Sequence, residues 1–202
     1  MPELESVEKT VKLMTLWVSE IGPKELDPEE RWWTFPRQGP IMGFFGVRPL
    51  IVIGDQPSTD SWPESHPSRV LLYGTLIKLG VPDAHLTDVI KRRGKGSESR
   101  KTLPADFRGH LDLLRREIDI IQPSRIVALG VCAEQLLLEH LPEVREKVRR
   151  VWHFAFGARP GRAEGFEAQL RAAILQPSRA IAQRGRETHR GGKWEEKRWW
   201  QL

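Results

Sequence analysis

The stretch Pro49-Leu50-Ile51-Val52-Ile53-Gly54-Asp55-Gln56-Pro57-Ser58 decides how the rest of this sequence is interpreted. Its first five residues form an uninterrupted apolar run that stops at Gly54. Such a run is typical of a strand that is buried on both faces, as in a parallel sheet. Gly54 allows a sharp exit from the strand, and polar residues follow it directly. We therefore expect a buried strand with a functional loop at 54–58.

Helix and strand patterns alternate along the rest of the chain. Residues 3–20 have the apolar spacing of an amphipathic helix, and 22–48 is an irregular segment with many aromatic residues. Apolar patterns predict helices over 69–79, 107–121, 131–140 and 163–175, and further strands over 84–90, 126–130 and 151–156. Alternation of this kind specifies a parallel sheet with helices on both faces. We therefore expect a three-layer α/β/α fold around a central, mainly parallel four-stranded sheet.

The 202 residues are enough for one domain with short appendages. Residues 1–48 are expected to pack on the core as a helix and an aromatic-rich segment. Residues 49–176 form the α/β core, and 177–202 form a basic tail that contains tryptophans. The tail is interpreted as either disordered or folded back through those tryptophans.

The composition excludes several classes of protein. Cys132 is the only cysteine, which excludes a disulfide within the chain and a four-cysteine metal cluster. The amino terminus is acidic, unlike a signal peptide, and no apolar run is long enough to span a membrane. We expect a cytoplasmic monomer with no cofactor, no metal and no membrane association.

The charge pattern indicates a polyanionic partner. The net charge is +5, and basic residues concentrate in two clusters, at 91–101 and 145–162. A solvated surface is the alternative explanation, but two clusters that flank one predicted face favour contact with a phosphate backbone. The sequence therefore predicts DNA as the partner.

Polar residues stand at three of the predicted strand ends, in Asp55-Gln56, in Thr87-Asp88 and at His153. Ligands of open parallel sheets bind outside the carboxyl ends of the strands. The alternatives are turn or cap roles for Asp55, Gln56 and Asp88 and a structural role for the histidine. The nearby Ser65-His66-Pro67-Ser68 is interpreted as a loop that leads into a helix, with Ser68 as the helix cap.

The motifs across 50–175 resemble the uracil-DNA glycosylase superfamily. In its iron–sulfur branch the first loop is Gly-Glu-Ala-Pro-Gly, the middle strand ends in Thr-Asn-Val-Val-Lys, and the late motif is His-Pro-Ser-Ala-Leu-Leu-Arg. This chain has Gly54–Ser58, Thr87–Lys91 and His153–Arg159 in the same order, and its strand Ile126–Gly130 runs into a helix. Without the cluster cysteines, the chain is similar to a divergent, cluster-free member.

The resemblance implies an enzyme that flips a damaged base out of DNA and hydrolyses its N-glycosidic bond. It implies a catalytic pair, with Asp55 stabilising the sugar cation and orienting or deprotonating water, and His153 stabilising the departing base. Residues at the first two strand ends would bind the base: Gln56, Thr87 and Asp88. Residues around them would bind DNA, the two phenylalanines as wedges: Ser58, Lys91, Arg92, Arg93, Phe154, Phe156 and Arg159.

Two positions depart from the family pattern. Gln56 stands where several branches have an Asp or Asn that holds the attacking water, and Asp88 stands where an Asn is usual. An ionised Asp88 would accept from the N3–H of uracil but repel its O4, so uracil or another deaminated or modified base remains open. The alternatives are a non-catalytic nucleic-acid-binding member of the fold and a nucleotide-binding α/β enzyme. No phosphate-loop or dinucleotide glycine motif supports the latter.

Overall fold

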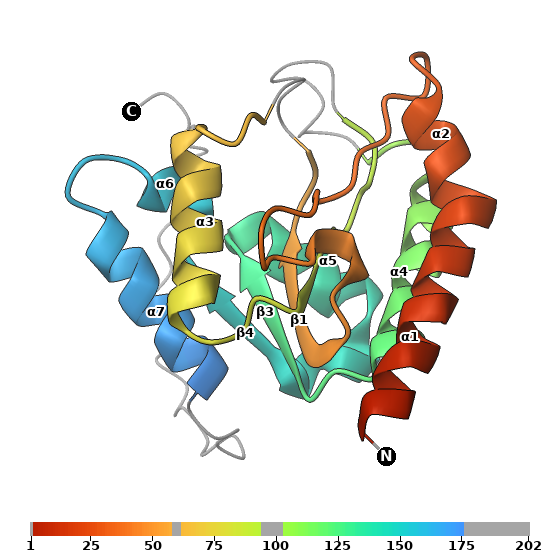
Figure 1. Ribbon diagram of the computed structural model, residues 1–202. Coiled ribbons are helices and arrows are strands. Elements are labelled where there is room, and N and C mark those ends of the chain that lie inside the picture. The colour runs from red at the N-terminus through yellow and green to blue at the C-terminus, as the bar shows by residue number, and fades with distance from the viewer. Residues whose placement is uncertain (1, 58–61, 94–102, 176–202) are drawn as a thin grey trace.

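The computed structural model describes residues 2–57, 62–93 and 103–175 (Figure 1). Its centre is a parallel sheet of four strands in the order β2-β1-β3-β4. The strands are β1 (Arg48–Gly54), β2 (Ala84–Asp88), β3 (Arg125–Leu129) and β4 (Val148–Val151). The predicted α/β/α class and four-stranded sheet are confirmed. The predicted tail at 177–202 lies outside the described residues.

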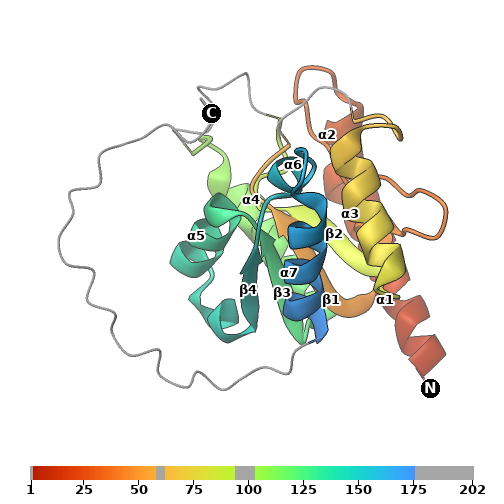
Figure 2. The ribbon, with the colours of Figure 1, turned by 90° about the vertical axis from the view of Figure 1, so that its left-hand side faces the viewer.

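Helices cover both faces of the sheet (Figures 1 and 2). Ile51 and Ile53 of β1 face one core cluster, whereas Leu50 and Val52 face the other. This alternation explains why the run had to be apolar throughout. The first cluster contains residues of α1 (Pro2–Leu16), α4 (Phe107–Ile121) and α5 (Val131–His140), and the second contains residues of α3 (Pro67–Lys78) and α7 (Ala163–Leu175).

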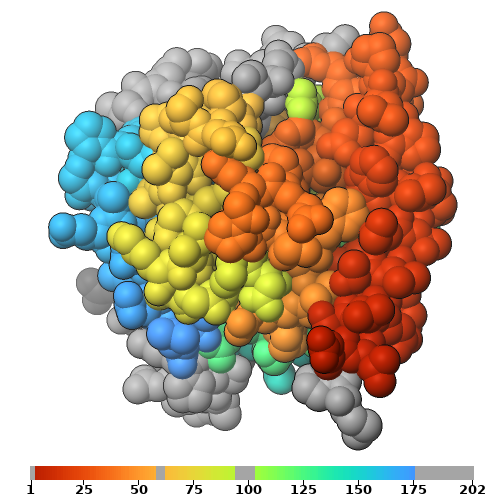
Figure 3. Space-filling model, viewed as in Figure 1, coloured from red at the N-terminus to blue at the C-terminus, as the bar shows by residue number. Residues whose placement is uncertain are grey.

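Short elements complete the structure at the amino-terminal side. A π-helical turn (Trp17–Ile21) and α2 (Gly22–Leu26) follow α1, and a 3-10 turn (Gly43–Phe45) precedes β1. A second 3-10 turn (Pro142–Lys147) precedes β4. In the space-filling view, the orange segment before β1 closes the surface between α1 and α3 (Figure 3).

The amphipathic helix predicted at 3–20 is present, but the apolar residues that indicated it face solvent. Leu13, Leu16 and Ile21 are buried in the core instead. Arg116 of α4 pairs with Glu20 at 3.0 Å and helps to hold this orientation. Apolar spacing marked the helix without showing which of its faces packs. The exposed residues are Leu4, Val7, Val11, Met14 and Val18.

The strand predicted at 151–156 is wrong, because β4 ends at Val151 and residues Phe154–Gly157 form the short helix α6. His153 is the N-cap of this helix, because its Nδ1 accepts a hydrogen bond from the backbone N–H of Ala155 at 3.2 Å. The basic cluster at 145–162 is consequently divided. Residues 145–147 precede β4 and residues 159–162 follow it, so the two groups lie toward opposite ends of this strand.

Candidate functional site

The carboxyl ends of β1 and β2 are held side by side. Gly54 is in register with Asp88, and the chain continues this pairing beyond both strands. Val89 donates its N–H to the carbonyl of Gly54 at 3.0 Å, and Ile90 donates to the carbonyl of Asp55 at 2.9 Å. These bonds fix the backbone of the predicted loop where it leaves the sheet.

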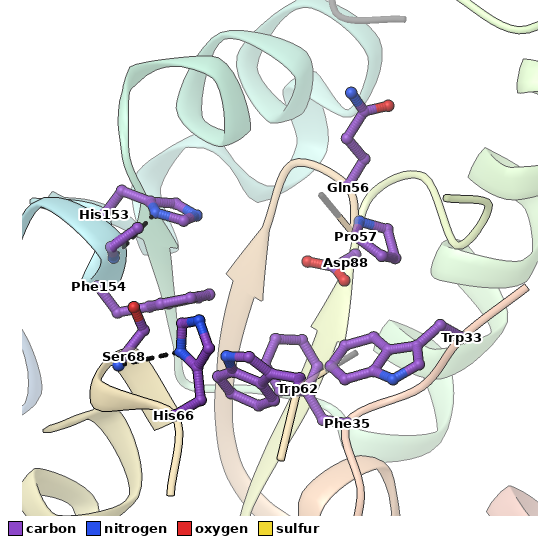
Figure 4. A pocket seen from close by; sticks show the side chains of 11 residues that line it. Trp33, Phe35, Gln56, Pro57, Trp62, His66, Ser68, Asp88, His153 and Phe154 are labelled. Carbon is purple, nitrogen blue, oxygen red and sulfur yellow. Dashed lines mark hydrogen bonds between the residues drawn. The ribbon is translucent and has the colours of Figure 1, made fainter. Parts of the chain in front are cut away.

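A pocket of about 530 Å³, counting the open space at its mouth, lies at this edge on the α3 side (Figure 4). The polar side chains at its border come from all three predicted strand ends and from the start of α3: Gln56, His66, Ser68, Asp88 and His153. Its apolar wall consists of four aromatic side chains: Trp33, Phe35, Trp62 and Phe154.

Trp62 is the centre of the aromatic wall. Its ring centroid lies 5.6 Å from that of Trp33, 5.5 Å from Phe35 and 5.5 Å from Phe154. Arg69 of α3 holds it in place, because Nη1 donates to the Trp62 carbonyl at 2.7 Å. Trp33 and Phe35 meet the Trp62 ring edge to face and Phe154 is tilted by 43°, so the four rings form one closely packed aromatic wall.

Three of these aromatic residues were missed as site residues in the sequence. Trp33 and Phe35 belong to the aromatic-rich segment, where Trp33 donates its N–H to the carbonyl of Lys91 at 3.0 Å. That bond brings the segment to the end of β2. The abundance of aromatics between 22 and 48 was the available signal, and nothing in the sequence linked it, or Trp62, to the strand ends.

The predicted catalytic pair is brought together. Nε2 of His153 lies 4.0 Å from Oδ1 of Asp55, and both side chains are partly exposed. His153 packs over Gly130, where an added Cβ would stand 3.3 Å from the Cβ of His153. Gly130 has φ 95° and ψ 173°, a conformation that glycine alone adopts readily. The glycine at the end of β3 thus sets the height of His153 above the sheet.

No family model matches this chain, and a search of curated proteins finds no match either. The functional interpretation therefore depends on the geometry of these side chains and on their chemistry.

Asp88 forms a nearly buried acidic wall of the pocket. Its side chain packs so closely on the backbone of Gly54 that a Cβ there would stand 2.1 Å from Oδ1. Burial raises the pKa of Asp88 well above its ordinary value, and the carboxylate of Asp55 adds to this effect. The Lys91 ammonium opposes it only in part. Asp88 therefore stays protonated to a higher pH than an exposed aspartic acid.

Thr87 does not line the pocket, because neighbouring residues of a strand point to opposite faces. Asp88 faces α3, whereas Thr87 faces α4 and accepts a hydrogen bond from Lys91 Nζ at 2.9 Å. The prediction that Thr87 binds a base is therefore wrong. Its hydroxyl belongs to a buried polar network.

Lys91 is the centre of that network and not a DNA-binding side chain. It is 1% exposed, and its Nζ lies 2.8 Å from Oε1 of Glu117 and donates to the Asp88 carbonyl at 2.9 Å. His85 Nε2 lies 3.2 Å from the other oxygen of Glu117. Burial alone would raise the pKa of Glu117, but the Lys91 ammonium and the hydrogen bond to His85 lower it below its ordinary value. The predicted phosphate contact of Lys91 is excluded by this burial.

The other predicted DNA-binding residues differ in position. Arg92 is exposed near Asp106, at 3.7 Å, and the Arg159 guanidinium lies over the Phe156 ring at 5.4 Å. Phe156 packs against Trp152 at 5.1 Å and does not border the pocket, whereas Phe154 does. The Phe156 wedge is thus not supported.

Three further predicted residues need separate mention. Arg93 is partly buried, and its backbone N–H donates to the carbonyl of Arg31 at 2.9 Å. Gln56 borders the pocket, but its side chain points away from it in Figure 4. Ser58 lies outside the described residues.

The described ranges contain no group of three or more His, Cys, Asp or Glu side chains that could hold a metal ion. Across the same ranges, no helix is both long and apolar enough to cross a membrane.

Proposed function

We propose that this protein is a DNA glycosylase-like enzyme that accepts a flipped, deaminated base and hydrolyses its N-glycosidic bond. The observation that carries the proposal is the Asp55–His153 pair, 4.0 Å apart, beside a pocket with an aromatic wall and an acidic end. A base must leave the helix stack before its glycosidic bond can be reached, and a pocket with an aromatic wall is suited to receive it.

The two members of the pair have complementary tasks in this proposal. Departure of the base leaves positive charge on the sugar and negative charge on the base. The carboxylate of Asp55 stabilises the sugar cation and orients or deprotonates the attacking water. His153 accepts a backbone hydrogen bond at Nδ1, so its neutral ring carries the proton on Nε2 and donates to the departing base.

Asp88 supports a deaminated base as the substrate. Its raised pKa favours the neutral acid, which offers an O–H donor beside a carbonyl acceptor. That pair matches the adjacent N–H and C=O groups of a lactam, which uracil, hypoxanthine and xanthine all carry. The ionised carboxylate would lack the donor. Protonation thus gives Asp88 the hydrogen-bonding capacity of the Asn that is usual in the resembled family.

The basic surface supports DNA as the carrier of the base. Arg92 and Arg159 are exposed beyond the carboxyl ends of β2 and β4. Guanidinium groups there can neutralise phosphates on either side of a flipped nucleotide. Phe154, which borders the pocket, is the remaining candidate to contact the disturbed base stack.

The test is incubation with duplex and single-stranded oligonucleotides that contain uracil, hypoxanthine or xanthine, followed by alkali. We expect strand breaks at the lesion, and a large loss of them in Asp55→Asn and His153→Asn. The surface substitution Arg171→Gln, distant from the pocket, serves as the control. Salt-dependent binding with no breaks on any lesion, at excess folded protein, would instead establish a non-catalytic binding module.

A further inference from the structure

His66 borders the pocket but has no part in the catalysis proposed above. Its side chain is the N-cap of α3, where Nδ1 accepts the backbone N–H of Ser68 at 3.3 Å. The prediction that Ser68 caps this helix is therefore wrong, because the N-cap is His66, two residues earlier. Because Nδ1 is the acceptor, the neutral ring carries its proton on Nε2. In Figure 4 that nitrogen is turned toward the pocket, and His66 and Asp88 lie on different sides of the pocket.

His153 has the same arrangement at the start of α6, with Nδ1 accepting from Ala155. Two imidazoles of fixed tautomer therefore border one pocket, and each presents an Nε2–H donor. With Asp88 they place three polar groups at the border of the pocket, beside its aromatic wall. A ligand that covers the His66 donor without offering it an acceptor loses affinity, because a desolvated donor must then remain unpaired.

The acceptors of the candidate bases differ in number and position. When the lactam edge of uracil faces Asp88, its O2 is the only acceptor left, and C5 and C6 carry only hydrogen. Hypoxanthine in the same orientation keeps two ring acceptors, N3 and N7, on its two flanks. A purine can therefore satisfy both imidazole donors, whereas uracil can satisfy one.

We propose that His66 is a specificity-determining residue whose Nε2–H donates to N7 of a deaminated purine, so that hypoxanthine binds in preference to uracil. The inference rests on the proposed function, because it assumes that the pocket holds a base with its lactam edge on Asp88. It adds a residue to the site and narrows the substrate to the purine class. The Trp62 ring, 6.5 Å from the His66 ring, supplies the adjoining flat surface for the second ring of the purine.

The test is calorimetric binding of 9-methylhypoxanthine, its 7-deaza analogue and 1-methyluracil, in which methyl groups replace the sugar. The variant is His66→Asn, because Asn is also a favoured N-cap and keeps α3 intact, as thermal unfolding would verify. His140→Asn, outside the pocket, is the matched control. For the unmodified protein we expect the 7-deaza change to weaken binding about five-fold, the effect of one neutral hydrogen bond.

In His66→Asn, the two purines should bind equally, and 1-methyluracil should bind more tightly than to the unmodified protein, because it no longer leaves an imidazole donor unpaired. An equal 7-deaza effect in both proteins, or no 7-deaza effect in either, would overturn the role of His66 while leaving base binding intact. Failure of all three compounds to bind folded protein would overturn both proposals.

Discussion

Replacement of Lys91 by methionine separates the buried position of this residue from the DNA-binding role that its basic neighbours suggested. Lys91 and Glu117 are both fully buried, with their charged atoms 2.8 Å apart. Lys91→Met keeps much of the volume but leaves the Glu117 carboxylate with His85 as its remaining close partner. Removing one partner of a buried ion pair destabilises proteins by about 3–5 kcal/mol. We expect a loss of that size in the free energy of unfolding.

The assay is urea denaturation, with the double variant Lys91→Met/Glu117→Leu as a second arm. Because the double variant leaves no unpaired charge, it should recover most of the stability. Lys78→Met is the matched control, since Lys78 makes a 3.0 Å ion pair with Glu167 on the surface and should unfold as the unmodified protein does. An unchanged urea midpoint for Lys91→Met, with a shallower salt dependence of DNA binding, would refute the buried network.

Three other substitutions give expected outcomes of different kinds. Gly130→Ala should lower the free energy of unfolding by about 1–3 kcal/mol, measured in urea, and reduce base release because His153 is displaced; an active, equally stable variant would contradict this. Asp88→Asn should bind a lactam base with an affinity independent of pH, whereas the unmodified protein should lose affinity as pH rises through the raised Asp88 pKa. The same dependence of affinity on pH in both proteins would refute binding by the protonated form of Asp88. Burial lowers the pKa of His110 to about 4, so, as the pH falls, His110 takes up a proton in the unfolded chain before it does so in the folded protein. Stability should therefore fall from about pH 6.5 to 4, and His110→Phe should flatten that fall in a thermal melt series; an unchanged slope would contradict the burial of a neutral ring.

The parts of the fold that local patterns specify were predictable. The bounds of α4, α5 and α7 agree with the sequence prediction, because each helix combines a regular apolar spacing with a clear start or stop. The apolar run of β1 predicted a strand that is buried on both faces, and the structure has a core cluster on each face. The meeting of Asp55 and His153 followed from the rule that parallel strands end at one edge.

The errors share one cause, which is that a residue's environment depends on distant segments. Lys91 looked solvated within a basic run, yet the Glu117 carboxylate of α4, which also contacts His85 of β2, neutralises it in the interior. The aromatic wall joins Trp33 and Trp62, which are 29 positions apart in sequence, through contacts that no local pattern encodes. The sequence placed His66 in a loop that leads into a helix. Only the structure shows that its ring, besides accepting a hydrogen bond from Ser68, also borders the pocket.

The measurement that tests the proposed function most directly is mass-spectrometric quantification of free base, at single turnover, from a duplex with one hypoxanthine or uracil. We predict one free base for each abasic site formed, with release abolished or strongly reduced in Asp55→Asn while DNA binding is retained. Full retention of the base in the DNA by the folded, DNA-bound protein would contradict the account. So would equal release by the Asp55→Asn variant, since the catalytic pair would then have no role.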